Sequence, residues 1–176
     1  MKQSPGRGEM NEPERRLSRF REAQDRLHSG FASALAEIRS GRKCGHWIWY
    51  VFPQISGLGS SELSRRFAIE NEAEAEAFLR DPELRSRLLT IADALAEQIK
   101  GAAAPSLRTV MNSEIDARKV VSSLTLFRHV AKILSETESS EVYGPLAAVA
   151  EQILAIAASQ GYPACEHTLQ RLGSIR

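Results

Sequence analysis

The sequence predicts an all-α protein, and three observations support this fold class. Over several long segments, apolar residues recur at spacings of three and four, which places them on one face of a helix. Prolines and glycines stand at the boundaries of these segments, where helices begin and end. No segment alternates apolar and polar residues convincingly, except the aromatic run over 46–54. We expect a compact single-domain bundle of about six to eight helices over residues 13–176, after a disordered leader over residues 1–12.

The first two expected helices are separated by a glycine. The pattern becomes helical from Pro13, its apolar positions continue to Leu27, and Gly30 then interrupts it. A second helix follows from Phe31 and ends at Gly41, because glycine readily takes the left-handed conformation that terminates a helix.

The next two expected helices have clear boundaries. A short helix over 71–81 is closed by Asp81 and Pro82, and this proline opens the following helix in its first turn. That following helix ends near Gly101. Its apolar stripe is formed by Leu84, Leu88, Ile91, Leu95 and Ile99.

Three helices complete the expected bundle. A long one runs from about Ser113 to Ser135, a second begins at Gly144, and a short terminal one covers residues 165–173. The apolar face of the long helix is formed by Val120, Leu124, Phe127, Ala131 and Leu134.

Composition limits the class of protein. The chain has 176 residues, of which 43% are hydrophobic and 26% charged, as in ordinary soluble globular proteins. The formal net charge of +1 provides no bulk attraction to nucleic acid or to an anionic membrane. The two cysteines, Cys44 and Cys165, form neither a disulfide framework nor a C-x-x-C metal pair. With no run of 18 apolar residues and no secretory signal pattern, we expect a cytoplasmic protein that does not bind membranes.

The aromatic side chains gather in one short stretch, "HWIWYVFPQ" over residues 46–54. A strand here would have no partner, so we expect a short helix or tightly wound segment that ends at Pro53. The simplest interpretation is that Trp47 and Trp49 are core, together with the neighbouring Tyr50 and Phe52. His46 differs, because it follows a basic, glycine-containing turn and is suited to partial exposure. It is either a structural histidine or a candidate acid or base.

The exit from this stretch, "SGLGSSELSRR", resembles a phosphate-binding loop only loosely. Gly57 and Gly59 form G-x-G, but no third glycine follows and no strand precedes them. A serine at 60 or 61 would cap the next helix, whose first turn holds Glu62, a residue that would repel a phosphate. Arg66 keeps an anion site open as a hypothesis.

A polar stripe lies on the long helix. Arg118, Ser122, Thr125 and His129 are spaced four, three and four apart and therefore share one face. Serine is a poor residue in the interior of a helix, so Ser122 needs a reason. Three alternatives are open: exposure to solvent, close packing of a neighbouring helix, or a polar pocket lined by Ser122, Thr125 and Lys119.

Four segments together resemble a known family. They are "GRKCGHWIWYVFPQISGLGSS", "RRFAI", "DARKVVSSLTLF" and "TLQRLG", in this order. They resemble a bacterial family of uncharacterised proteins, catalogued as a domain of unknown function and sometimes labelled calpastatin. The resemblance covers roughly residues 17–173 and implies a compact all-helical fold without an established activity. The label does not suit this chain, because calpain-inhibitory segments are disordered and fold on their target.

The favoured hypothesis is a small-molecule-binding domain or enzyme that acts on an anionic or nucleotide-like ligand in a pocket near His46. His46 would be the acid or base, and Lys119 or Arg66 would hold the charge. The other candidate ligand-binding residues are Trp47, Gln54, Ser122 and Thr125. We expect no cofactor and no metal, because the four histidines lack ligand spacing.

The alternative is a non-catalytic protein-interaction module in which the aromatic cluster is only core, with a homo-oligomer as one form of partner. Nucleic-acid binding would use basic residues such as Lys43 beside the tryptophans, but the near-zero net charge disfavours it. The favoured hypothesis requires that the aromatic run and the serine-bearing helix meet and leave a polar hollow between them.

Overall fold

The protein is described here from a computed structural model, which covers residues 12–173, with side chains from residue 16 onward. The leader expected over residues 1–12 therefore lies outside the described residues, except for Glu12.

Within residues 12–173 the chain forms ten α-helices and one 3-10 helix, and its only bridge of β type is an isolated pairing of Ile55 with Ile69. In chain order the helices are α1 (Glu12–Gln24), α2 (Phe31–Arg39), α3 (Ile48–Val51), α4 (Glu62–Arg66), α5 (Glu72–Arg80), α6 (Pro82–Ile99), α7 (Leu107–Met111), α8 (Glu114–Thr137), η1 (Glu141–Tyr143), α9 (Gly144–Ser159) and α10 (Glu166–Gly173). The all-α prediction is confirmed. The expected number of six to eight is low, because α3, α4 and α7 have only four or five residues each and show no periodicity.

The first helix is shorter than its apolar pattern suggested. It ends at Gln24, and Leu27 lies in the following turn with 87% of its surface exposed. Gln24 is buried and donates a hydrogen bond of 2.7 Å to the carbonyl oxygen of Tyr50, which fixes this end of α1 against α3. At Gly30 a Cβ atom would lie 2.3 Å from two carbonyl oxygens of the turn, so the chain can reverse here only with a glycine.

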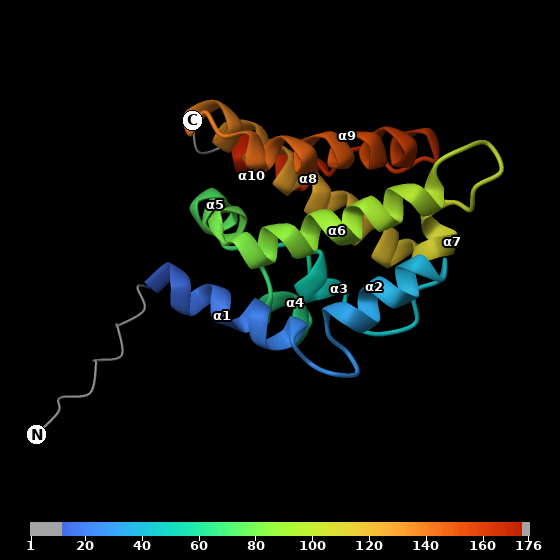
Figure 1. Cartoon of the computed structure of the whole chain (residues 1–176), viewed down its shortest axis with the longest axis horizontal. Helices are drawn as coiled ribbons and strands as arrows, with labels where there is room; N and C mark the ends of the chain where they lie inside the picture. The colour runs from blue at the N-terminus through green and yellow to red at the C-terminus, as the bar shows by residue number, and fades with distance from the viewer. Residues whose placement is uncertain (1–11, 174–176) are drawn as a thin grey trace, which may run out of the picture.

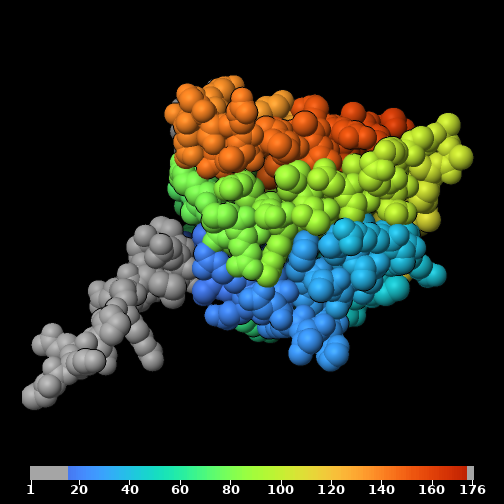
Figure 2. All heavy atoms as spheres, viewed as in Figure 1, coloured from blue at the N-terminus to red at the C-terminus, as the bar shows by residue number. Residues whose placement is uncertain are grey.

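The helices form three layers in the view of Figure 1. α6 crosses the middle, α9 lies above it, and α1 and α2 lie below it. Helix α6 packs against α2 on one side and α9 on the other, and α8 packs against α9, α5 and α7. Figure 2 shows these layers in continuous contact on that face of the molecule. The core is therefore built around α6 and α8, whose predicted apolar stripes are buried.

One described segment, Glu141–Ser159, is long and apolar enough to cross a membrane by length and composition, with a mean hydropathy of 1.4. Its α9 part places Leu146, Ala150 and Ile153 in the core against α6 and α8. The apolar composition of this helix is thus accounted for by its packing in the bundle.

The aromatic run winds into α3, and Pro53 follows its end, as predicted. Trp47 and Phe52 are completely buried, and the ring of Tyr50 lies 5.2 Å from that of Phe67. Their assignment to the core is correct. Trp49 is only partly buried and faces a groove described below.

Candidate functional site

The turn before α3 is organised around one carboxylate. Oε2 of Glu37, on α2, accepts hydrogen bonds from the backbone nitrogens of Cys44 and Gly45 at 2.7 and 2.8 Å, and from Nε1 of Trp47 at 2.7 Å. Burial alone would raise the pKa of Glu37, but these three bonds and the nearby Lys43 ammonium outweigh it and lower the pKa. A Cβ at position 45 would lie 2.9 Å from Glu37 Oε1 and from the Trp47 ring, so the close turn requires glycine. The turn therefore fixes Trp47 in the core.

Lys43 connects this turn to the long helix α8. It is only 6% exposed, its Nζ donates to the carbonyl oxygen of Gly45 at 2.6 Å, and it lies 5.0 Å above the ring of Trp47. Its ion-pair partner is Asp116, at 2.7 Å. A buried ammonium requires such a partner, because an unpaired charge in the interior is strongly unfavourable.

Asp116 is shared between two lysines. Its second oxygen, Oδ1, accepts from Nζ of Lys119 at 3.0 Å. Burial alone would raise the pKa of Asp116, but its bonds to Lys43 and Lys119 outweigh this effect and lower it. The ammonium of Lys119 lies 4.3 Å from the centre of the Trp49 ring. One half-buried carboxylate thus holds a cation over an aromatic face that is accessible from outside.

That face forms part of a groove of about 760 Å³, which we call the groove throughout. Trp49 and Gln54 line it, together with part of the loop over 56–64, whose last three residues are the first of α4. The first turns of α8, with Ile115 to Ser122, and the turn over 162–166 form its walls. The groove is therefore the point at which the aromatic run, α8 and the start of α10 meet.

A second aromatic ring with a cation also lines the groove. The guanidinium of Arg118 is 5.5 Å from the centre of the Tyr162 ring, and both residues line the groove. Arg118 also pairs with Glu114 one turn earlier, at 2.9 Å, in an exposed position. The groove therefore contains two aromatic faces, each with its own cation.

The mid-helix serine and threonine of α8 are buried, so exposure to solvent does not explain them. Ser122 is 2% exposed, lies at the edge of the groove and is 3.2 Å from the hydroxyl of Thr168 on α10. Thr125 is fully buried, donates to the carbonyl oxygen of Val121 at 2.7 Å and accepts from the backbone nitrogen of Cys165 at 3.2 Å. Both small side chains hold α10 and its preceding turn close to α8.

Three of the candidate residues from the sequence come together in the groove: Gln54, Lys119 and Ser122. The other four do not line it. Trp47 is sealed in the core, Thr125 lies behind the wall, and His46 is exposed. Arg66 lines a separate hollow beside the loop.

Sequence reasoning missed Trp49, Tyr162 and Cys165 as groove residues. Trp49 was grouped with the core, although residues two apart on a helix point roughly 200° apart and cannot share one environment. The stretch around Tyr162 was treated only as a break between helices. An aromatic residue beside a proline in such a break was the available signal.

Two of the remaining histidines, His129 and His167, have structural partners. His129 Nε2 lies 3.3 Å from Glu72, and His167 Nε2 lies 3.0 Å from the carbonyl oxygen of Ser56. In the part of the chain that the structure describes, no group of three or more His, Cys, Asp or Glu side chains is arranged to hold a metal ion.

These features define a helical domain with one aromatic and cationic groove, and comparisons with known proteins give its family. The family described as "Protein of unknown function (DUF1810)" matches residues 14–142, and the chain belongs to it. The fold is similar to the crystal structure of the conserved hypothetical protein Rv1873 from Mycobacterium tuberculosis, with a TM-score of 0.68 and 30% sequence identity. This similarity covers 89% of the present chain and 96% of that protein. A comparison with curated proteins gave no match.

Proposed function

We propose that the groove binds a small, planar, anionic molecule of nucleotide-like chemistry. The observation that carries this proposal is the pairing of each aromatic face with a cation: Lys119 with Trp49, and Arg118 with Tyr162. Aromatic rings offer stacking surfaces to a flat ligand, and adjacent cations offer bonds to its negative groups.

The geometry around Trp49 favours a preorganised site. Lys119 does not need to be immobilised by the ligand, because Asp116 already holds it at 3.0 Å. Holding a flexible side chain in place beforehand lowers the entropic cost of binding. Two lysines share the one carboxylate, so the ion-pair group retains a positive charge that suits an anion.

The accessible surface of the groove is mostly apolar, as expected for a small-molecule site, and polar groups are available to orient the ligand. Gln54 is partly exposed in the groove, and its amide can both donate and accept. Ser122 contributes a hydroxyl at the edge. We assign Gln54 and Ser122 to the orientation of the ligand.

Whether the bound molecule is also transformed is a separate hypothesis. His46 stays the predicted acid or base, and its exposed position outside the lining of the groove means that the ligand would have to extend to it. A His46→Ala variant that binds the ligand normally but loses turnover would support the catalytic role.

Tryptophan fluorescence tests the binding proposal directly. Trp49 faces the groove whereas Trp47 is fully buried, so a stacked ligand should quench Trp49 and leave Trp47 nearly unchanged. We expect concentration-dependent quenching by members of a nucleoside and nucleotide panel in the wild type. In Trp49→Phe, where only Trp47 emits, this quenching should be absent.

The variant Lys119→Gln tests whether the positive charge of Lys119 contributes to ligand binding. Its affinity for anionic panel members should fall about tenfold, the equivalent of losing one hydrogen bond to a charged group. Lys100→Gln removes the same charge from an exposed position outside the groove and should leave the affinity unchanged. Equal effects of both variants, or equal quenching in Trp49→Phe and wild type, would contradict the proposal.

A second candidate function has its own observation. Two apolar side chains on the rim of the groove are exposed, Ile115 by 66% and Leu58 by 37%, as at sites that bind another protein. This favours the non-catalytic interaction module, with a second copy of the chain as the simplest partner. Light scattering distinguishes it: a dimer that Ile115→Asp converts to monomer would support this function over the first.

The expected cytoplasmic location belongs to the same proposal. Cys44 is exposed and Cys165 is half-buried, and both are free thiols. Free thiols suit a reducing compartment, where nucleotide-like ligands are also abundant.

A further inference from the structure

The loop over 56–64 separates the groove from a second hollow, and its position is fixed by α10. His167 lies 3.0 Å from the carbonyl oxygen of Ser56. At Gly57, where φ is +98°, a Cβ would lie 3.0 Å from the His167 ring, so the loop can approach α10 this closely only with glycine. The loop is therefore held in a fixed position between the groove and the second hollow.

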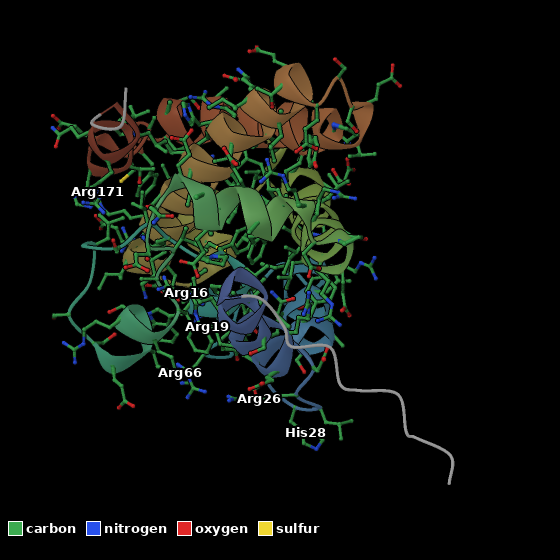
Figure 3. All side chains as sticks on the ribbon, turned by 90° about the vertical axis from the view of Figure 1, so that its left-hand side faces the viewer. Arg16, Arg19, Arg26, His28, Arg66 and Arg171 are labelled. Atoms are coloured by element: carbon green, nitrogen blue, oxygen red, sulfur yellow. The ribbon has the colours of Figure 1, made fainter. Side chains whose placement is uncertain are left out.

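The second hollow has a volume of about 350 Å³ and is basic; we call it the basic hollow. It lies between α1 and α4. Figure 3 shows Arg16, Arg19 and Arg66 arranged along this side of the molecule. The charged residues that line it are four arginines and two glutamates: Arg16, Arg19, Arg65, Arg66, Glu70 and Glu74.

Two of these arginines have carboxylate partners. Arg19 pairs with the buried Glu74 at 2.7 Å, and Arg16 pairs with Glu70. These pairs neutralise both glutamates of the basic hollow.

The other two arginines, on α4, supply the excess positive charge. Arg65 donates a hydrogen bond of 2.6 Å to the carbonyl oxygen of Ser60, and Arg66 lies 5.4 Å from the Phe67 ring centre. Among the described residues neither has an ion pair with a carboxylate. Two guanidinium groups therefore stay available to an anion, and guanidinium groups match phosphate oxygens in geometry.

A small cavity of about 140 Å³ beneath the loop shares lining residues with both hollows. It shares Trp49 and Gln54 with the groove, and Arg65 and Ala68 with the basic hollow. It is too small for a second ring, and it adjoins both neighbours through these shared residues. We call the three adjoining spaces the path; it has the groove at one end and the basic hollow at the other.

We infer that one ligand occupies this path: its planar group stacks in the groove, and a tail of more than one phosphate extends past the loop to Arg65 and Arg66. This inference rests on the proposed function and specifies the ligand class as a nucleoside polyphosphate. The two ends of the path differ in their residues, because Trp49 and Tyr162 both line the groove, whereas Arg65 and Arg66 both line the basic hollow.

Phosphate number is the variable that tests this inference. Quenching of Trp49 is titrated with adenosine and guanosine and with their mono-, di- and triphosphates, in wild type and in Arg66→Gln. For the base that quenches, we expect the triphosphate to bind about tenfold more tightly than the monophosphate in wild type, the gain of one charged hydrogen bond. In Arg66→Gln this gain should disappear while the affinity for the nucleoside is unchanged.

Two further variants separate local from general charge effects. Arg108→Gln removes the same charge from an exposed position on α7 outside the path and should keep the gain. Arg66→Lys keeps a positive charge at this position and should retain part of the gain in affinity for the triphosphate.

Failure of the inference differs from failure of the proposed function. Quenching that depends on Trp49 but is equally strong for mono- and triphosphate, or a gain lost equally in Arg66→Gln and Arg108→Gln, would overturn the inference alone. No quenching by any member of either series would overturn both.

Discussion

Among single residues, Asp116 links the core to the groove. On one side it neutralises the buried Lys43, and on the other it holds Lys119 above Trp49. Removal of this carboxylate should lower the stability of the fold, because the buried charge of Lys43 is then left unpaired.

We therefore predict that Asp116→Asn lowers the free energy of unfolding by about 3 kcal/mol, since Lys43 would lose its charged partner in the interior. Urea denaturation measures this change. The matched control is Lys43→Met in the Asp116→Asn background, which removes the unpaired charge and should recover much of the loss. If Asp116→Asn lowers the free energy of unfolding by less than about 1 kcal/mol, the ammonium of Lys43 is solvated in the variant and does not depend on this ion pair.

The candidate site could be predicted in part at this scale. Gln54, Lys119 and Ser122 were identified because polar groups beside an aromatic run and on one helix face suggest a pocket. Helical spacing indicates that Trp47 and Trp49 point in different directions, but which of them is buried depends on Glu37, which lies in another helix. Sequence spacing contains no information on such a contact.

At the scale of elements, α8 determines where the C-terminal part of the chain lies. Its buried hydroxyls receive the turn before α10, through Thr125 to Cys165 and Ser122 to Thr168. This turn carries Tyr162, the second aromatic wall of the groove. The packing of α8 and α10 therefore sets the width of the groove.

Thr125→Val should test this arrangement, because valine has nearly the same shape but cannot accept the bond from the Cys165 nitrogen. We expect a loss of about 1–3 kcal/mol in unfolding free energy and faster hydrogen exchange of the Cys165 amide. Thr137→Val is the control, since Thr137 makes a similar bond to Ile133 in an exposed position and should change little. Unchanged exchange at Cys165 would contradict the role assigned to Thr125.

Most long elements could be predicted because their signals are local. Asp81 caps α6 by accepting from the nitrogens of Glu83 and Leu84, and Pro82 lies in its first turn, as the sequence indicated. The short α7 could not be found in this way. It has one turn, is capped by Ser106, and ends at Asn112 in the left-handed conformation, so tertiary packing and not periodicity maintains it.

For the whole molecule, pH dependence follows from two carboxylates with lowered pKa values. Glu37 and Asp116 are both stabilised in the charged form in the folded state, by hydrogen bonds and by lysines. The unfolded chain then binds more protons than the folded chain at acid pH, so stability falls with falling pH. Asp93 acts in the opposite direction, because burial and the nearby Glu97 raise its pKa.

We predict that the contribution of Glu37 is fully present above pH 5 and is lost as pH falls below about 4.5, through its lowered pKa. Glu37→Gln should therefore be less stable than wild type by about 1–2 kcal/mol at pH 7. This difference should shrink as pH falls through the lowered pKa of Glu37. Melting curves across this range measure it. Glu136→Gln, at an exposed position on α8, is the control, and a difference for Glu37→Gln that does not depend on pH would contradict the assignment.

The two free cysteines differ in exposure and in position, so their reactivity with alkylating reagents can report whether the groove is occupied. Cys44 is open to reagents on the outer surface, whereas Cys165 lines the groove and is half-covered. Alkylation should therefore modify Cys44 first, in the presence or absence of an occupant. Shielding of Cys165 alone would mark the groove as filled within a single molecule, and mass spectrometry of the two peptides would read both sites from one sample.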